Sequence, residues 1–415
     1  MPVRRRATCP CDNPSVTARR TITDAQRRAR LAKRHRLVPG ERTDDVAAIA
    51  DSVVALHSTD PSTVYLSAMV RMQHPSVEAV SKALYDDRTV VRHHAMRRTL
   101  WVFTPQTARW AHAACTVALA TTQWKRLAKM AEDSGIATDG AAWAEVARAE
   151  TFAALSSMGT ATARQLGKQV PALTQKLHLG VVAGNVAMSG AHTRLLLNLG
   201  FDGVIVRGRP AGSWNNSEYP WSVADEWIPG GLAGADAATG TAELARNYLA
   251  RFGPVTTADL QWWAGWTTGS TKRALAAIQA VEVDLDDEQG GGVGWILPDD
   301  SDDEAPKPWM AFLPALDSTT MGWKNRAWYL GDLATFGGPV FDVNGNAGPT
   351  IWVDGRVVGS WAQRASGEIA YRLFTDLPAR RVKAIAAEAE RTRELIGDAR
   401  VNVRFPAPVQ RELLA

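Results

Sequence analysis

Two segments of this chain repeat one local pattern, which restricts its fold more than any other feature of the sequence. MGTATARQLGKQVPAL begins at Met158, and FGPVTTADLQWWAGW begins at Phe252. In each segment a glycine precedes a threonine suited to cap a short helix, and a turn follows. This order is typical of the start of a helix-turn-helix, so the sequence predicts tandem helix-turn-helix units.

The order of predicted elements extends this interpretation to the first part of the chain. Helical patterns over residues 21–36, 43–54 and 76–84 precede two β segments, TVVRHH and RRTLWVF, rich in valine, threonine and aromatic residues. Three helices followed by a hairpin is the order of a winged helix. A second unit would contain helices over 140–156 and 187–199, and a third would contain helices over 241–252 and 270–280.

From Trp309 onward β patterns dominate, with Asp354-Gly355 and Asn344-Gly345 as turn pairs. One helix is predicted over 378–398 and a last strand over 401–405. The fold class expected is therefore α+β, with tandem winged-helix units before a C-terminal β-barrel-like domain. The predicted boundaries are 1–20 for a flexible basic arm, 21–135, 136–235 and 236–305 for three winged-helix units, and 306–415 for the barrel-like domain.

Charge is strongly segregated along the chain. Residues 1–42 contain twelve Lys and Arg but three acidic residues, whereas residues 281–305 contain ten Asp and Glu and no Lys or Arg. A basic block suits a polyanion such as DNA, although a solvated arm with one basic helix face explains it equally well. The acidic run is expected to face away from phosphate, and it lacks the EF-hand spacing of a calcium site.

Several protein classes are excluded. No apolar run approaches the length of a membrane helix, and the N-terminus lacks the apolar core of a signal peptide. The three cysteines cannot form a disulfide framework, which favours the cytoplasm. Cys9 and Cys11 have no second pair at zinc-finger spacing, and nucleotide-binding and common hydrolase motifs are absent. We therefore expect no metal and no cofactor.

One polar segment stands out as a candidate site. His57, Ser58, Thr59 and Asp60 follow an apolar helix directly and precede Pro61. Such a segment suits the edge of a cleft, because buried polar groups need partners. The alternative is structural: Asp60 before proline is a good helix cap, and His57 is then a histidine with satisfied hydrogen bonds at a helix end.

Further candidates are basic or amide side chains suited to phosphate or groove contacts. Arg92, His93, Arg97 and Arg98 lie on the two β segments, with a solvated basic hairpin as the alternative interpretation. The remaining members of the predicted DNA-contact set are Arg71, Lys324, Arg326, Asn344 and Asn346. Trp262, Trp263 and Trp266, at helical spacing, are interpreted as core residues.

Five stretches in this order carry a family resemblance: LHSTDPSTVYLSAMVRM, HAMRRTLWVF, GSWNNSEYPW, LPALDSTTMGWKNR and PTIWVDGRVVGSW. Together they resemble the bacterial tandem winged-helix DNA glycosylases, which include the azinomycin-resistance and AlkX (YcaQ)-like crosslink-unhooking proteins. The resemblance covers nearly the whole chain from about Thr21. The family's Gln-x-Gln or Gln-x-Asp catalytic motif falls here on His57-Ser58-Thr59, so both of its glutamines are replaced.

The resemblance implies a cytoplasmic, nucleoid-associated, monomeric DNA glycosylase that acts on bulky or crosslinking N7-alkylpurines in double-stranded DNA. An N7-alkylated purine is cationic and leaves readily, so the enzyme has to position a water and stabilise an oxocarbenium-like sugar. His57 would orient or deprotonate the water, Thr59 would hold it, and Asp60 would supply negative charge. The alternatives are a non-enzymatic winged-helix DNA-binding protein or transcriptional regulator and, more weakly, an RNA-binding protein.

Overall fold

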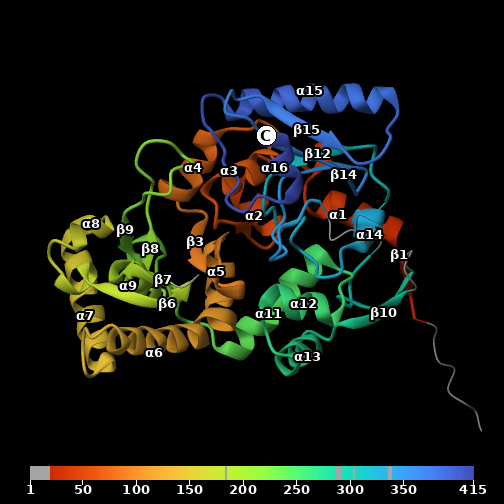
Figure 1. Cartoon of the computed structure of the whole chain (residues 1–415). Helices are drawn as coiled ribbons and strands as arrows, with labels where there is room; N and C mark the ends of the chain where they lie inside the picture. Colours follow the sequence, from red (N-terminus) through yellow and green to blue (C-terminus); the bar gives the residue numbers. More distant parts are fainter. Residues whose placement is uncertain (1–18, 183–184, 287–290, 302–303, 335–338) are drawn as a thin grey trace, which may run out of the picture.

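The computed structural model describes residues 19–182, 185–286, 291–301, 304–334 and 339–415. Helices and short antiparallel sheets alternate along the chain, which confirms the α+β class (Figure 1). No helix in these ranges combines the length and apolar character that a membrane span requires.

The first group of elements has the order helix, strand, helix, helix, strand, strand. Its members are α2 (Val46–Ser52), β2 (Leu56–His57), α3 (Pro61–Met69), α4 (Val77–Tyr85), β3 (Val91–His94) and β4 (Leu100–Phe103). The sheet order is β2-β4-β3. Side chains of Asp45, Asp60 and Ser76 cap the three helices. The sequence prediction missed α3, whose first residue Pro61 directly follows the cap.

The second group repeats this order with a hairpin inserted. Its members are α7 (Gly140–Met158), β5 (Thr160–Ala161), α8 (Ala163–Leu166), α9 (Ala191–Phe201), β8 (Ile205–Arg207) and β9 (Trp221–Val223), and its sheet order is β5-β9-β8. The inserted hairpin consists of β6 (Lys176–Val182) and β7 (Asn185–Gly190). The helix predicted from residue 187 therefore begins later, at Ala191, because β7 occupies the preceding residues.

The third group contains α11 (Ala237–Phe252), α12 (Thr257–Ala264), α13 (Thr268–Ala277), β10 (Val281–Asp286) and β11 (Gly292–Ile296). An antiparallel bridge from Val255 to Trp295 supplies the short first strand. Thr256 forms a capping box with Asp259, just as Thr162 does with Gln165 before α8. The two capped helices predicted from the repeated pattern are thus confirmed.

The N-terminal segment does not belong to the first group. β1 (Thr21–Thr23) pairs in parallel with β10, and α1 (Asp24–Arg34) packs against α11 and α14 (Ala327–Leu330). Arg30 and Arg34 both bond the Asp300 carboxylate, at 2.7 and 3.1 Å. Part of the basic block therefore neutralises the acidic run instead of presenting free charge to a polyanion. The greater part of the predicted arm, residues 1–18, lies outside the described ranges.

The C-terminal region is built on an open four-stranded sheet. The strand order is β12 (Met310–Leu313), β13 (Thr350–Val353), β14 (Arg356–Gln363), β15 (Ile369–Leu373), all antiparallel. α15 (Ala379–Ile396) and α16 (Pro408–Leu414) both pack on this sheet. No closed barrel occurs in the described chain. The strand predicted over 401–405 is wrong, because these residues form an irregular segment whose Val401 N–H donates to the Gln363 side chain.

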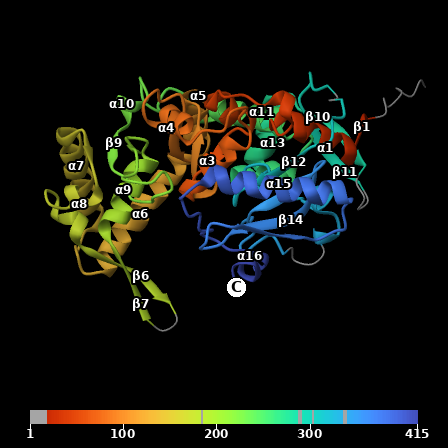
Figure 2. The same ribbon diagram turned by 90° about the horizontal axis from the view of Figure 1, so that it is seen from above.

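Three apolar clusters of the described residues support this arrangement, the smallest formed by Ile22, Val283, Leu285 and Ile296 of β1, β10 and β11. The largest cluster joins residues of the first group, the third group and the C-terminal sheet, whereas the second group has its own core around Leu195 and Trp221. A long helical connection leads to the second group through α5 (Pro105–Ala111), a π-helical turn (His112–Thr116) and α6 (Val117–Asp133). Figure 2 shows that the β6–β7 hairpin and α16 project toward the same side of the molecule.

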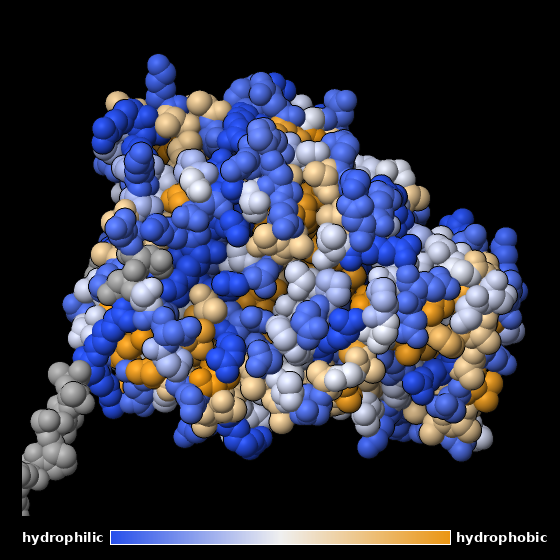
Figure 3. All heavy atoms as spheres, turned by 180° about the vertical axis from the view of Figure 1, so that it is seen from behind, coloured by the Kyte–Doolittle hydropathy of each residue, from blue (hydrophilic) through white to orange (hydrophobic). Residues whose placement is uncertain are grey.

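Figure 3 shows the opposite face from that of Figure 1. Hydrophilic side chains cover most of it, and hydrophobic residues appear as small separate groups. This face therefore offers no broad apolar surface for a partner.

Candidate active site and nucleic-acid interface

The polar segment His57–Asp60 connects β2 to the N-terminus of α3. His57 is 3% exposed, and its ring lies edge-on to Trp101 with a centroid distance of 4.6 Å. The Thr59 N–H donates a hydrogen bond to His57 Nδ1 at 3.4 Å. His57 and Thr59, the two residues expected to orient and hold the water, are thus held close together by this hydrogen bond within one turn of the backbone.

Burial decides what His57 can do. Burial, aided by the positive charge of Arg97, lowers the pKa of His57 to about 3. The imidazole is therefore neutral at pH 7 and is a weak base. This disfavours the predicted deprotonation of water by His57 and leaves the orienting role, since a neutral imidazole still donates and accepts hydrogen bonds.

The side-chain oxygens of Thr59 and Asp60 differ in the hydrogen bonds that they make within the protein. Asp60 Oδ1 accepts from the N–H and the hydroxyl of Ser62, at 2.9 and 2.6 Å, so the carboxylate does cap α3. It also lines a cavity of ≈ 10 Å³ beside the C-terminal sheet. The Thr59 hydroxyl is buried and has no hydrogen-bond partner among the described residues. Since buried hydroxyls are normally bonded, Thr59 has capacity left for a water or a substrate.

Arg92 and Arg404 bond this segment and Arg207 lies within electrostatic range of both, and we call these three arginines the guanidinium cluster. Arg404 Nη1 lies 3.4 Å from the Thr59 carbonyl oxygen, and Arg92 Nε donates to the Ser58 hydroxyl at 3.0 Å. Arg207 lies 4.2 Å from the ring centre of Tyr219. Burial lowers the pKa of Arg207 to about 10; Tyr219 opposes this shift, and the charges of Arg92 and Arg404 contribute to it.

No carboxylate of the described chain forms an ion pair with any member of the guanidinium cluster. Three neighbouring cations without a counter-charge are suited to bind phosphate groups. Sequence reasoning found Arg92 but missed Arg207 and Arg404. Neither lies in a local motif, because tertiary packing alone brings Arg404 to Thr59 and Arg207 close to Arg92 and Arg404.

The structure does bring two other predicted contacts together. Arg97 lies 4.1 Å and Arg326 5.1 Å from the ring centre of Trp262. Arg326 also donates to the Gly345 carbonyl at 3.3 Å, which joins the predicted Asn344–Asn346 turn to this surface. Burial, then the charge of Arg326, lowers the pKa of Arg97 to about 10. Trp262 thus supports two cations, whereas its neighbour Trp263 is a core residue as predicted.

The exposure of the predicted DNA contacts varies widely. Arg98, Lys324 and Asn344 are exposed. Asn346 donates its side-chain amide to Asp342 at 2.9 Å, so it helps to build the turn. Arg92 is 9% exposed and also bonds the Tyr85 hydroxyl.

Two predicted DNA contacts are wrong in this structure. Arg71 is fully buried, with its guanidinium paired to Asp317 at 2.9 Å. His93 is 2% exposed, and its Nε2 lies 3.1 Å from His112 Nδ1. Both side chains point into the protein, and their sequence neighbourhood alone does not reveal this.

Arg98 provides a direct test of the exposed basic surface. Arg98→Ala should weaken binding to undamaged duplex and reduce the slope of log K against log salt by about 0.9, the loss of one phosphate contact. The measurement is fluorescence anisotropy between 50 and 200 mM salt. Arg380→Ala, on the far helix α15 and also exposed, is the matched control. An unchanged slope for Arg98→Ala would remove this residue from the interface.

Buried histidines make stability depend on pH. Burial lowers the pKa of His35 and of His57 to about 3, and it lowers the pKa of His93 and of His94 well below 6.5. Below pH 6.5 the unfolded chain takes up protons that the folded chain does not. Each such histidine should therefore reduce the free energy of unfolding by up to about 1.4 kcal/mol per pH unit as the pH falls from 6.5 toward 3.

Urea denaturation at pH 7, 6 and 5 checks this expectation. The exposed His74 serves as the control, because His74→Ala should leave the decline between pH 7 and 5 in place. Equal stability at pH 7 and pH 5 would contradict the burial of these histidines.

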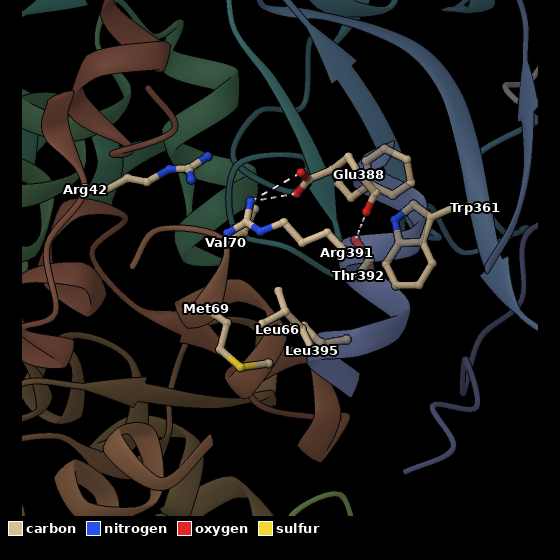
Figure 4. Close-up of a pocket in the computed structure, with 10 residues that line it drawn as sticks. Arg42, Leu66, Met69, Val70, Trp361, Glu388, Arg391, Thr392 and Leu395 are labelled. Carbon is tan, nitrogen blue, oxygen red and sulfur yellow. Dashed lines mark hydrogen bonds and ion pairs between the residues drawn. The ribbon is translucent and has the colours of Figure 1, made fainter. Parts of the chain in front are cut away.

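The cavities differ in what they can hold. Figure 4 shows one between α3 and α15, where Arg391 pairs with Glu388 beside Trp361. Its volume of ≈ 30 Å³ suits a water molecule and excludes a nucleobase. A much larger groove of ≈ 1030 Å³ runs along α8 and α9 and includes Arg207 and Tyr219. Of these hollows, the groove is the one that reaches the guanidinium cluster.

Within the described ranges, no three metal-binding side chains gather into a cluster. Part of the acidic run, residues 287–290 and 302–303, lies outside those ranges.

A family model and solved structures both match this chain. The family model described as DNA glycosylase AlkZ-like matches residues 50–395. Among solved structures, the DNA glycosylase AlkZ of Streptomyces sahachiroi is similar, with a TM-score of 0.68 and 18% identity over 92% of this chain and 99% of that one. At 18% identity, this structural similarity is evidence for the fold alone. No curated protein sequence matches.

Proposed function

Because the chain belongs to the AlkZ-like DNA glycosylase family, we propose that it hydrolyses the N-glycosidic bond of bulky or crosslinking N7-alkylpurines in duplex DNA. The observation that carries this proposal is the buried Thr59 hydroxyl, which has no hydrogen-bond partner in the described part of the chain and lies in a segment bonded by Arg92 and Arg404. A free hydroxyl beside unpaired guanidiniums suits a water next to a sugar with phosphates on both sides.

The chemistry needs little acid catalysis. An N7-alkylated purine is a cationic leaving group, so bond breaking leaves an oxocarbenium-like sugar that water must attack. Thr59 would hold the water, and the neutral His57, whose Nδ1 accepts from the Thr59 N–H, would fix the turn that orients it. The Asp60 carboxylate would stabilise the positive charge that develops on the sugar.

Both glutamines of the family's motif are replaced in this mechanism. Glutamine offers an amide that donates and accepts, and neutral histidine and threonine also do both. His57 and Thr59 can therefore hold a water by the same kinds of hydrogen bonds. The Asp60 carboxylate then supplies negative charge directly after the motif.

We further propose that the three repeated groups are winged-helix units, within 46–103, 140–223 and 237–296, so that the first unit begins after the predicted start at residue 21. The support is their common order of helix, strand, helix, helix, strand, strand, and in the first two groups the first strand pairs with the last. The enzyme would act as a monomer on damaged DNA of the nucleoid, in the cytoplasm.

A substrate panel tests the proposed lesion class. Wild-type enzyme would be given duplexes containing N7-methylguanine, a nitrogen-mustard interstrand crosslink or a bulky intercalating N7 adduct. We expect base release from all three, with the bulky lesions processed because a cationic base leaves without being enclosed in a tight pocket. Release of N7-methylguanine alone would overturn the assignment to bulky and crosslinking lesions.

A further inference from the structure

We infer that the groove along α8 and α9 binds the sugar–phosphate backbone of the DNA that flanks the reacting nucleotide. We call it the α8–α9 groove. This inference rests on the proposed function for the identity of the polyanion, and it extends the DNA contact into the second group of elements.

The charge of the groove lining favours an anion. Arg164, Lys168, Lys176 and Arg207 line it, and of its described lining residues only Glu218 is acidic. Arg164, Lys168 and Lys176 are exposed. None of the four cations forms an ion pair within the described residues. Their charges are therefore free for a ligand.

The N-terminus of α9 opens into the same groove. Gly190 is the N-cap residue and provides no side-chain hydrogen bond, and Gly190, His192 and Thr193 line the groove. Helix α9 has 11 residues, and although its Ala191 N–H donates to the Gln175 carbonyl at 2.8 Å, its dipole favours an anion at this end. This contribution is independent of the side-chain charges.

Arg207 connects the groove to the candidate active site. Its guanidinium stacks on Tyr219 and lies 5.5 Å from the ring centre of Trp221, both of which line the groove. Its Nε is buried without a hydrogen-bond partner. Arg207 also belongs to the guanidinium cluster beside Thr59. A strand bound along the groove would therefore lead toward the reacting nucleotide.

The size and lining point to a polymer. At ≈ 1030 Å³ the groove is as large as the largest ordinary small-molecule sites, yet its cations are spread over α8, the turn after it, β6 and β8 and do not converge on one point. Distributed cations match the regular spacing of phosphates along a strand.

The test compares two double variants of the full chain. Lys168→Ala/Lys176→Ala removes two groove cations, and Arg380→Ala/Lys383→Ala removes two exposed, unpaired cations from α15. The first should raise the Kd for undamaged duplex about tenfold at 150 mM salt and reduce the salt slope by about 1.8. The second should change neither. Equal thermal melting of all three proteins excludes unfolding as the cause.

A second readout separates this inference from the proposed function. At subsaturating enzyme, single-turnover base release by Lys168→Ala/Lys176→Ala should fall in proportion to its weaker binding, whereas Arg380→Ala/Lys383→Ala should release base at the wild-type rate. If wild type releases no base but the groove variant still loses salt slope, the proposed function fails and the groove assignment stands. An unchanged Kd and slope in the groove variant would overturn the assignment, whatever the base-release result.

Discussion

Asp317→Ala should reduce the free energy of unfolding by about 3–5 kcal/mol, because it leaves the Arg71 guanidinium buried without its counter-charge. Both side chains are fully buried, and two N–H groups of Arg71 donate to the two carboxylate oxygens at 2.9 Å. Burial raises the pKa of Asp317, but the charge and hydrogen bonds of Arg71 outweigh it and leave that pKa below its usual value. The pair joins α3 to the start of the C-terminal region.

Urea denaturation of three variants checks this expectation. Arg71→Met/Asp317→Leu removes both charges and should recover much of the loss, because a buried pair replaced by apolar groups is often neutral. Glu390→Ala breaks the exposed Glu390–Arg393 pair and should change stability far less than Asp317→Ala, because water screens an exposed pair. A loss for Asp317→Ala as small as that for Glu390→Ala would contradict the network described.

Asp60→Asn should lower single-turnover base release about 100-fold or more, because it removes the negative charge placed next to Thr59. The substitution preserves the helix cap, since an asparagine oxygen can still accept from the Ser62 N–H. The melting temperature should therefore remain close to that of wild type.

Asp60→Ala separates charge from capping. It should lose the same activity and in addition about 1 kcal/mol of stability, the usual value of an N-cap. If Asp60→Asn releases base at the wild-type rate, the carboxylate is only a helix cap and the electrostatic role is wrong.

The sequence predicted local features well and long-range pairings poorly. Threonine caps such as Thr256 act within one helical turn, so their sequence context was enough to predict α12. The role of α1 depends on Arg30 reaching Asp300, 270 residues away, and no local pattern predicts such a pair. The basic block consequently looked free, although part of it is neutralised within the fold.

The candidate site shows the same division. His57, Thr59 and Asp60 were found because they form one contiguous polar segment. Arg207 and Arg404 were missed because they come from β8 and from an irregular segment near the C-terminus. Arg71 was misassigned, since an arginine that pairs with a distant buried Asp317 has the same appearance in sequence as an exposed one.

The central claim is that His57-Ser58-Thr59, without glutamine, supports glycosylase chemistry, and one measurement tests it most directly. Wild type and Thr59→Val would be incubated in excess with a duplex containing one N7-methylguanine, and the freed base and abasic strand would be quantified by mass spectrometry. Valine keeps the shape of threonine and removes the unpartnered hydroxyl. We predict release by wild type and a loss of about 100-fold or more in Thr59→Val, with equal duplex affinity. Equal release by both proteins, or none by wild type despite tight binding, would contradict the account.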